Sequence, residues 1–400
     1  MKKTLVLLLT AILLVGIFVA CGNNSAPPSE SAPPAVTQDE GDSEGSTAAA
    51  ATEEGYKIAF TRNFYGNSWT TQYEQAVRSR FEEYKAMGVV SDYTYVACNA
   101  DVTEQLNQLN ALLQEDYDLI MIDAVSPTSL TGFIEEANAK GVQIIFGTTN
   151  SPYEGIPCFA TDYSVYGRSE AYYLCEKIGG KGNIIEIHGV AGDPNCDLFT
   201  LYAHQVYEMY DINILASGNG FWNDADAQTE TATLLASYGD QIDAVFCEDG
   251  MAYGIVNAFL NAGRPLVPMG GDYFKSFVDY WYENQDVLDT LVVPNSPYAM
   301  GHVIVDCAVY SAAGYKPAKF SQNPLEESIS NWVPLSMPYL IFEKEEMDPF
   351  WLAEFPDTKV LSIEEAYQIM QGKEETAAIE LYFDDDYVAS LFGLDESLWW

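Results

Sequence analysis

Short apolar runs alternate with amphipathic stretches along most of the chain. The run YKIAF precedes residues 70–87, where Tyr73, Val77 and Phe81 recur at helical spacing before Gly88. The pattern returns in YTYVA, DLIMIDA, VQIIFG, NIIEIHG, INILASG and IDAVFCED, most of which lead into another helical stretch. Strand runs that are apolar on both faces are typical of parallel strands covered by helices. About ten such runs exceed one ordinary sheet, so we expect an α/β fold with two lobes, each a mostly parallel sheet with helices on both faces.

The alternation of strands and helices ends near Ala318. Beyond it, SISNWVPLSMPYLIFEKEEM contains apolar pieces interrupted by proline, and the chain ends in acidic and aromatic clusters. We expect this part to cross back to one lobe and then to form an extension packed on the surface. The expected division is residues 56–159 with 294–318 for the N-terminal lobe, 160–293 with 319–345 for the C-terminal lobe, and 346–400 for the C-terminal extension.

The N-terminus has the pattern of a targeting signal. Lys2 and Lys3 precede the uncharged apolar run of residues 5–19, which is short for a membrane span. Residues 1–20 are therefore interpreted as a signal peptide, and the rest of the chain is expected to be extracytoplasmic.

A lipid anchor and a tether are expected next. The sequence FVAC places Ala20 before Cys21, similar to the lipobox of bacterial lipoproteins, in which the cysteine is lipidated. An ordinary secretory signal with an incidental cysteine is the alternative. Residues 22–55 contain no aromatic residue, lysine or arginine, which is typical of a segment that does not fold. Residues 21–55 are therefore predicted to be a disordered linker that holds the folded body on the bacterial cell membrane.

Charge and cysteine usage restrict the partners. The formal net charge of −41 repels nucleic acid and anionic lipid headgroups, so we expect no nucleic-acid partner and membrane contact through the lipid anchor only. The six cysteines after Cys21 form no CxxC motif and no cluster with histidine. Buried free thiols are favoured, and no metal site is expected. Disulfides remain possible outside the cytoplasm.

Motifs for catalysis are missing from the sequence. It contains no G-x-S-x-G, H-E-x-x-H, Walker A or G-x-G-x-x-G pattern, and its 3 histidines are scattered. The stretch NDADAQTE is similar to a calcium loop but has Thr229 where that loop needs glycine. We therefore expect no enzyme and no cofactor. A glycosidase that uses two of the 59 acidic residues is a less favoured alternative, because nothing fixes a pair at the required separation.

Seven loop segments occur in the order found in a known family. They are GNSW, IDAVSPTSLTGFIEEANAKGVQII, ATDYSVYG, IHGVAGD, VFCEDGMAYG, MGGDY and PNSPYAMG. With these segments the chain resembles the sugar-type, ribose-binding-like substrate-binding lipoproteins of bacterial ABC transporters, over about residues 56–318. The resemblance implies the type I periplasmic-binding fold, with two Rossmann-like lobes joined by a multi-strand hinge. It also implies a monomer that closes on a sugar or polyol and delivers it to an ABC permease and ATPase.

The same resemblance implies a set of ligand-binding residues. Trp69 and Trp222 fall where aromatic rings cover opposite faces of a sugar, and Asp272 and Asn295 match the usual carboxylate and amide. The remaining positions implied to contact the ligand are Asn67, Ser68, Asp123, Thr148, Thr149, Asp197 and Glu248.

Several of these positions depart from the ribose-like pattern. Thr148 and Thr149 replace an Asp-Arg pair, Asp197 lies near another expected arginine, and Glu248 replaces an asparagine. The bidentate arginines that hold sugar hydroxyls are thus missing at the matched positions, which leaves an acidic cleft. A neutral sugar or polyol is the favoured ligand. The alternatives are a cationic or amino-bearing solute, or a nucleoside, in an acidic aromatic pocket. A sensory role in place of transport also stays open.

Overall fold

The computed structural model describes residues 54–342, 358–395 and 397–398. The predicted signal peptide, Cys21, the linker up to residue 53 and residues 343–357 lie outside the described residues. Among the residues that are described, no helix is long and apolar enough to cross a membrane.

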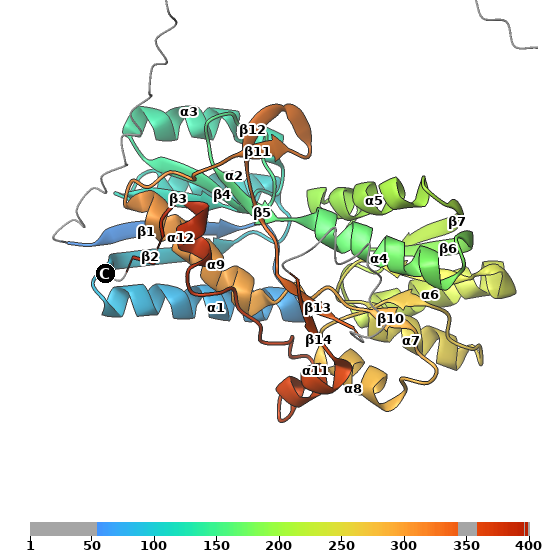
Figure 1. Ribbon diagram of the computed structural model, residues 1–400. Coiled ribbons are helices and arrows are strands. Elements are labelled where there is room, and N and C mark those ends of the chain that lie inside the picture. The colour runs from blue at the N-terminus through green and yellow to red at the C-terminus, as the bar shows by residue number, and fades with distance from the viewer. Residues whose placement is uncertain (1–53, 343–357, 396, 399–400) are drawn as a thin grey trace, which may run out of the picture. The chain divides into compact units, whose positions relative to one another are not determined.

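The first lobe is built on a seven-stranded sheet (Figure 1). Its strands, in spatial order, are β11 (Ser321–Asn323), β12 (Glu326–Leu335), β5 (Cys158–Thr161), β4 (Gln143–Thr148), β3 (Leu119–Ile122), β1 (Tyr56–Arg62) and β2 (Val90–Ala97). Neighbouring strands are parallel except for the antiparallel pair β11 and β12.

Helices cover both faces of this sheet because its strands are apolar on both faces. Ile58 and Phe60 of β1 pack with α1 (Ser68–Ala86) and α9 (Pro297–Ala312). Ala59, between them on the strand, packs in a separate core with α2 and α3. Successive side chains of a strand point to opposite faces, so one uninterrupted apolar run supplies both cores. The bounds are Val102–Leu112 for α2 and Thr131–Lys140 for α3, which the short helix η1 (Pro127–Leu130) precedes.

The second lobe repeats this arrangement on a five-stranded sheet with parallel neighbours. Its strands, in spatial order, are β10 (Thr290–Leu291), β9 (Met269–Gly270), β8 (Ala244–Cys247), β6 (Lys181–His188) and β7 (Asp211–Asn219). Ile184 of β6 packs with helices α4 and α5, whereas Ile185 packs with α6, α7 and α8 on the other face. The helix bounds are α4 (Tyr163–Lys177), α5 (Pro194–Tyr207), α6 (Asp224–Tyr238), η2 (Gly239–Gln241), α7 (Ala252–Asn261) and α8 (Lys275–Glu283). The prediction of two mostly parallel sheets, each with helices on both faces, is confirmed.

Three neighbouring segments of the described chain connect the two lobes at the hinge, and the C-terminal extension passes between the lobes once more. The first follows β5 at Asp162, whose backbone N–H donates to the Leu335 carbonyl at 3.0 Å. The third, near Ser336, is tied to the first because the Ser336 hydroxyl donates to the Asp162 carboxylate at 2.8 Å. Val292, in the second segment, exchanges backbone hydrogen bonds with Ile341 at 3.2 and 2.9 Å. These bonds hold the three segments together as a hinge.

The predicted position of residues 319–345 is wrong for most of that segment. Strands β11 and β12 belong to the first sheet, where Trp332 pairs with Cys158 on β5. The physical reason is the free edge of β5, on which Trp332 and Val333 bury their side chains on opposite faces of the sheet. Among the described residues of this segment, β13 (Tyr339–Ile341) and Phe342 pack against the second lobe, where Leu340 and Phe342 enter one of its cores.

The described part of the C-terminal extension contacts both lobes. Strand β14 (Lys359–Leu361) pairs in parallel with β13, and α11 (Ile363–Met370) packs against α8 of the second lobe. The chain then passes to the first lobe, where α12 (Tyr387–Leu391) packs against α9 (Figure 1). The extension is therefore integrated into both cores, beyond the surface packing that the sequence led us to expect.

Candidate functional site

A cavity of about 1090 Å³ lies where the loops at the carboxyl ends of the strands of both sheets converge. Residues at or directly after the ends of β1, β2, β4 and β5 line it from the first lobe, and residues after β6, β7, β8 and β9 line it from the second. Ligands of parallel α/β sheets bind at this edge, because loops and helix N-termini meet there. The volume is just above the range of about 300–1,000 Å³ that is usual for small-molecule sites.

The loop after β1 is fixed by the start of α1. Asn67 caps the helix by accepting from the Thr70 backbone N–H at 2.8 Å, and the Thr70 side chain accepts from the Asn67 N–H at 3.3 Å. Trp69 follows, and its indole Nε1 donates to the Asn295 carbonyl at 2.7 Å. One face of its ring stacks on Tyr73 at a centroid distance of 4.9 Å. The indole therefore lines the cavity in a fixed orientation.

Among the described residues that line the cavity, Arg62 is the one with a basic side chain. Its guanidinium forms a buried ion pair with Asp123 and donates to the Thr148 hydroxyl at 2.8 Å. Burial raises the pKa of the Asp123 carboxyl, and the neighbouring guanidinium opposes that shift. Asp123 is fully buried and does not line the cavity, so it holds Arg62 in place.

The loop after β7 presents Trp222 in an uncommon backbone conformation. Phe221 and Trp222 have φ angles of +54° and +53°, a region that residues with a side chain rarely adopt. The indole lies directly on the backbone of Gly189, where a Cβ atom would come within 2.0 Å of Trp222 Cε2. Its ring is 6.5 Å from the ring of Phe64, which belongs to the other lobe. Aromatic walls from both lobes thus meet at the cavity.

Backbone strain is concentrated at this cavity. Of the five described non-glycine residues with positive φ, four line it, namely Asn99, Thr148, Phe221 and Trp222. Such conformations cost about 1–3 kcal/mol each and persist where the surroundings impose them. Their position is consistent with a site that is shaped for a ligand.

Three aspartates line the cavity, namely Asp193, Asp224 and Asp249. Burial raises the pKa of Asp193 to about 6 and that of Asp249 to about 7. Burial also raises the pKa of Asp224, whose carboxylate accepts from the Gly254 N–H at 2.7 Å. Near neutral pH, the Asp193 and Asp249 carboxyl groups therefore exist partly in the protonated form, which can both donate and accept hydrogen bonds.

Buried polar atoms of the lining residues lack partners among the described residues. They comprise one donor and four acceptors: Arg62 Nε, Asn63 Oδ1, Asn195 Oδ1, Asp249 Oδ1 and Asn295 Oδ1. Buried polar groups are normally paired, so five unsatisfied atoms around one cavity are an unusual concentration.

The structure brings together only part of the predicted site. Six of the predicted residues line the cavity, namely Asn67, Ser68, Trp69, Thr148, Trp222 and Asn295. Five do not, namely Asp123, Thr149, Asp197, Glu248 and Asp272. Asp197 is exposed on α5, and Thr149 is fully buried. Asp272 turns to its own loop and accepts from the backbone N–H groups of Tyr273 and Phe274 at 2.7 and 3.3 Å.

Glu248 stabilises the loop beneath Trp222. Its carboxylate accepts from the Gly189 N–H at 2.7 Å and lies 2.9 Å from Nδ1 of His188. Glu186 lies on the other side of that imidazole, at 3.4 Å from Nε2. Burial lowers the pKa of His188, but the bonds to Glu186 and Glu248 outweigh it and raise the pKa to about 9. Glu248 is therefore bound to a charged histidine.

The expected set of ligand-binding residues left out several residues that line the cavity. Asn63 and Phe64 follow β1, and Asp193 and Asp249 follow β6 and β8. Their position in a loop after a predicted strand was the sequence signal that could have identified them. Glu374, in the C-terminal extension, carried no such signal. Among the described residues, no group of three or more His, Cys, Asp and Glu side chains is arranged to hold a metal ion. The six described cysteines are buried free thiols.

Comparison with known proteins identifies the family. Residues 58–316 match the periplasmic binding protein domain. A xylitol-binding protein of Mycolicibacterium smegmatis is 30% identical over 181 residues, which are 44% of this chain and 51% of that protein. A multiple sugar-binding periplasmic protein of Azospirillum brasilense is 28% identical over 47% of this chain and 58% of that protein. The chain thus spans about half the length of these curated relatives.

Solved structures share the fold. An ABC transporter solute-binding protein of Thermobispora bispora has a TM-score of 0.62 at 21% identity, covering 82% of this chain and 98% of that chain. A solute-binding protein of Mycobacterium smegmatis with bound glycerol has a TM-score of 0.57 at 20% identity, covering 70% of this chain and 92% of that chain.

Proposed function

Because this chain belongs to the periplasmic binding protein domain family, we propose that it is an extracytoplasmic solute-binding protein that captures a sugar or polyol between its lobes and delivers it to an ABC permease. The observation that carries the proposal is that aromatic side chains from both lobes, Phe64, Trp69 and Trp222, line one cavity together with amide and carboxyl side chains. Flat C–H faces of a sugar suit the aromatic rings, and its hydroxyls suit the polar atoms.

The state of the carboxyl groups favours a neutral ligand. A cationic ligand would need ionised carboxylates, whereas burial raises the pKa values of Asp193 and Asp249 toward neutrality. A partly protonated carboxyl matches a hydroxyl, which also both donates and accepts. Named relatives support the same ligand class, since one binds xylitol and another is a multiple sugar-binding protein.

The acidic lining also favours a second candidate ligand. A cationic or amino-bearing solute would pair with Asp193, Asp224 and Asp249 and would gain cation–π attraction from Trp69 and Trp222. Such a ligand would itself lower the pKa values of the aspartates, so its binding would weaken as pH falls.

We propose further that Cys21 carries a lipid anchor and that the folded body acts as a monomer. Delivery to a permease and signalling to a sensor would use the same cavity. Uptake of the bound sugar by cells that lack this chain, compared with cells that carry it, separates the two roles. Unchanged uptake would refute delivery.

A thermal-shift screen tests the ligand class. The panel contains xylitol, D-ribose, L-arabinose, D-allose and myo-inositol, with choline, spermidine and adenosine as the competing classes. A ligand at 100 times its dissociation constant should add about 2.7 kcal/mol of stability. A shift with choline or spermidine and with none of the sugars or polyols would overturn the proposal.

Aromatic variants test the position of the site. Trp222→Ala should abolish most of the ligand-induced shift, while Phe320→Ala should keep it, because Phe320 is 37% exposed and does not line the cavity. Equal shifts in both variants would place the ligand elsewhere.

A further inference from the structure

The C-terminal extension supplies one side of the cavity. Glu374, Thr376 and Ala377 are lining residues, although they are outside the matched domain of residues 58–316. We call residues 374–378 the C-terminal wall. It follows α11, which packs on the second lobe, and precedes α12, which packs on the first.

Gln72 of α1 holds the C-terminal wall on the first lobe. Its Nε2 donates to the Thr376 carbonyl at 3.0 Å, and its Oε1 accepts from the Ala378 N–H at 2.9 Å. The side-chain amide thus pairs with the backbone as a neighbouring strand would. The Tyr298 hydroxyl also donates to Oε1, at 3.1 Å, which fixes the orientation of the amide. Gln72 is buried, so water competes little for these bonds.

The second lobe holds the same residues from the other side. The Lys275 N–H donates to the Ala377 carbonyl at 2.9 Å, and the Ser276 N–H donates to the Glu375 carbonyl at 3.1 Å. Ala378 forms an antiparallel bridge with Phe274, which itself lines the cavity. The backbone of the C-terminal wall is therefore bonded to both lobes beside the cavity.

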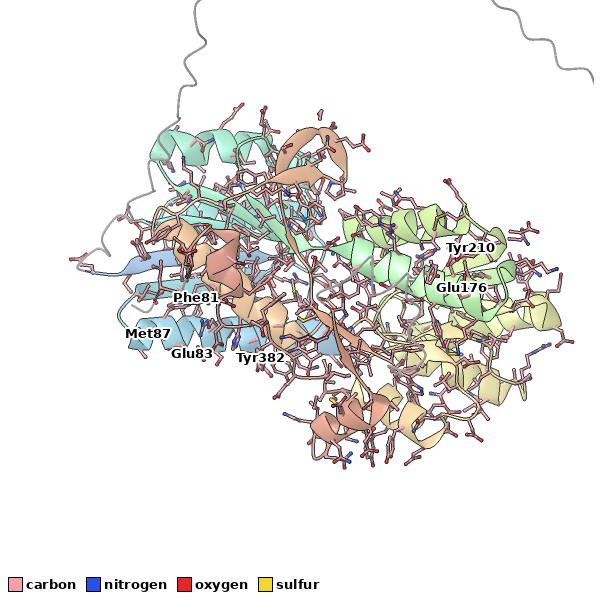
Figure 2. All side chains as sticks on the ribbon, in the orientation of Figure 1. Phe81, Glu83, Met87, Glu176, Tyr210 and Tyr382 are labelled. Atoms are coloured by element: carbon pink, nitrogen blue, oxygen red, sulfur yellow. The ribbon has the colours of Figure 1, made fainter. Side chains whose placement is uncertain are left out.

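The chain after the wall continues this attachment. The Ser296 hydroxyl donates to the Ile379 carbonyl at 2.9 Å and accepts from the Leu381 N–H at 3.3 Å. Ser296 follows Asn295, the residue whose carbonyl holds Trp69. Tyr382 packs on His302 of α9 at a centroid distance of 5.3 Å, and Figure 2 shows it on the same side of the first lobe as Glu83 of α1.

We propose that Glu374 and Thr376, the two exposed lining side chains of the C-terminal wall, contact the bound sugar or polyol as specificity-determining residues, with Gln72 as the positioning residue. This inference rests on the proposed function. The carbonyls of residues 375–377 and the Ala378 N–H are bonded to the two lobes, whereas the side chains of Glu374 and Thr376 are exposed at the cavity. A carboxylate accepts from a ligand hydroxyl, and a threonine hydroxyl both donates and accepts.

The ligand contacts are tested by calorimetric titration of the full chain with xylitol. Glu374→Gln and Thr376→Val should each weaken xylitol binding about tenfold. Glu375→Gln is the matched control, since Glu375 is adjacent and exposed but does not line the cavity. Its affinity should equal that of the unmodified chain.

The positioning role is tested by hydrogen exchange. In Gln72→Leu, the amides of residues 377–381 should exchange faster without ligand, while those of β14 should stay unchanged. Gln72→Glu keeps the acceptor for the Ala378 N–H, so it should restore part of the protection and part of the affinity. Faster exchange throughout both lobes, or unchanged exchange in both variants, would overturn the positioning role.

The outcomes separate this inference from the proposed function. If D-ribose, myo-inositol and xylitol all fail to bind the unmodified chain, the proposed function fails and the role of the wall in sugar binding fails with it. If the unmodified chain binds xylitol, and Glu374→Gln and Thr376→Val bind it equally well, only the role of the wall fails.

Discussion

Replacing Asp123 with asparagine should destabilise the protein and affect ligand binding only indirectly. The carboxylate is fully buried, and its guanidinium partner on Arg62 is 9% exposed. Asparagine keeps a carbonyl oxygen for a hydrogen bond but removes the charge. Arg62 then stays buried without its counter-charge.

The magnitude follows from the burial of the pair. Removing one partner of a buried ion pair costs about 3–5 kcal/mol, because the remaining charge is left uncompensated. The retained hydrogen bond places the expected loss at the lower end, about 3 kcal/mol. In a domain of about 150–250 residues, each 1 kcal/mol shifts the melting temperature by about 2–4 °C, so a loss of about 3 kcal/mol lowers it by about 6–12 °C.

The assay is urea unfolding, followed by circular dichroism, of the variant and two comparison proteins. Asp306→Asn breaks the ion pair with Arg80, in which the side chains are 13% and 27% exposed, so its loss should be smaller. The double variant Arg62→Met with Asp123→Leu removes both charges and should recover most of the stability. Its affinity for the ligand should nevertheless be lower than that of the unmodified chain, because the double variant lacks the Arg62 side chain at the cavity.

Two results would refute this reasoning. If Asp123→Asn unfolded at the same urea concentration as the unmodified chain, the ion pair would contribute nothing. If the variant kept its stability but lost affinity, Asp123 would contact the ligand directly, as the family resemblance first implied.

Three further predictions concern Trp222 and the loop beneath it. Trp222→Ala should weaken sugar binding at least tenfold in a calorimetric titration, since the loss of a large buried aromatic contact costs about 1.5–3 kcal/mol; equal affinity would remove it from the site. Gly189→Ala should also weaken binding, because the new Cβ would lie 2.0 Å from Trp222 Cε2, and unchanged indole fluorescence would contradict this. The pKa of His188 is raised to about 9, so its stabilisation of about 3 kcal/mol is complete below about pH 6.5 and is lost as pH rises through 9. In urea unfolding, the stability of His188→Gln should decline less over that range than that of the unmodified chain, and an equal decline would refute the assignment.

The sequence by itself determined that the sheets are parallel and that the ligand-binding loops follow the ends of their strands. Strand runs such as LIMI, residues 119–122, are apolar at every position, and only a parallel strand covered on both faces buries them completely. All strands of such a sheet end at one edge, so residues after a strand end, such as Trp69 and Trp222, could be expected near each other.

Tertiary structure alone decided which polar side chains face the cavity. Asp123 and Glu248 follow strand ends like the lining residues, but each turns to a partner that is distant in the sequence, Arg62 and His188. A buried carboxylate takes the nearest available donor, and that donor is known only when the strands are assembled.

The same is true of the chain beyond Ala318. Its local pattern gave no preference between the two lobes, because β12 could bury its side chains against any free sheet edge. The edge of β5 was available in the folded molecule, and that edge determined its place. The C-terminal wall depends on bonds to Gln72 and Lys275, which are about 300 and 100 residues away. Contacts over such separations cannot be read from a local sequence pattern.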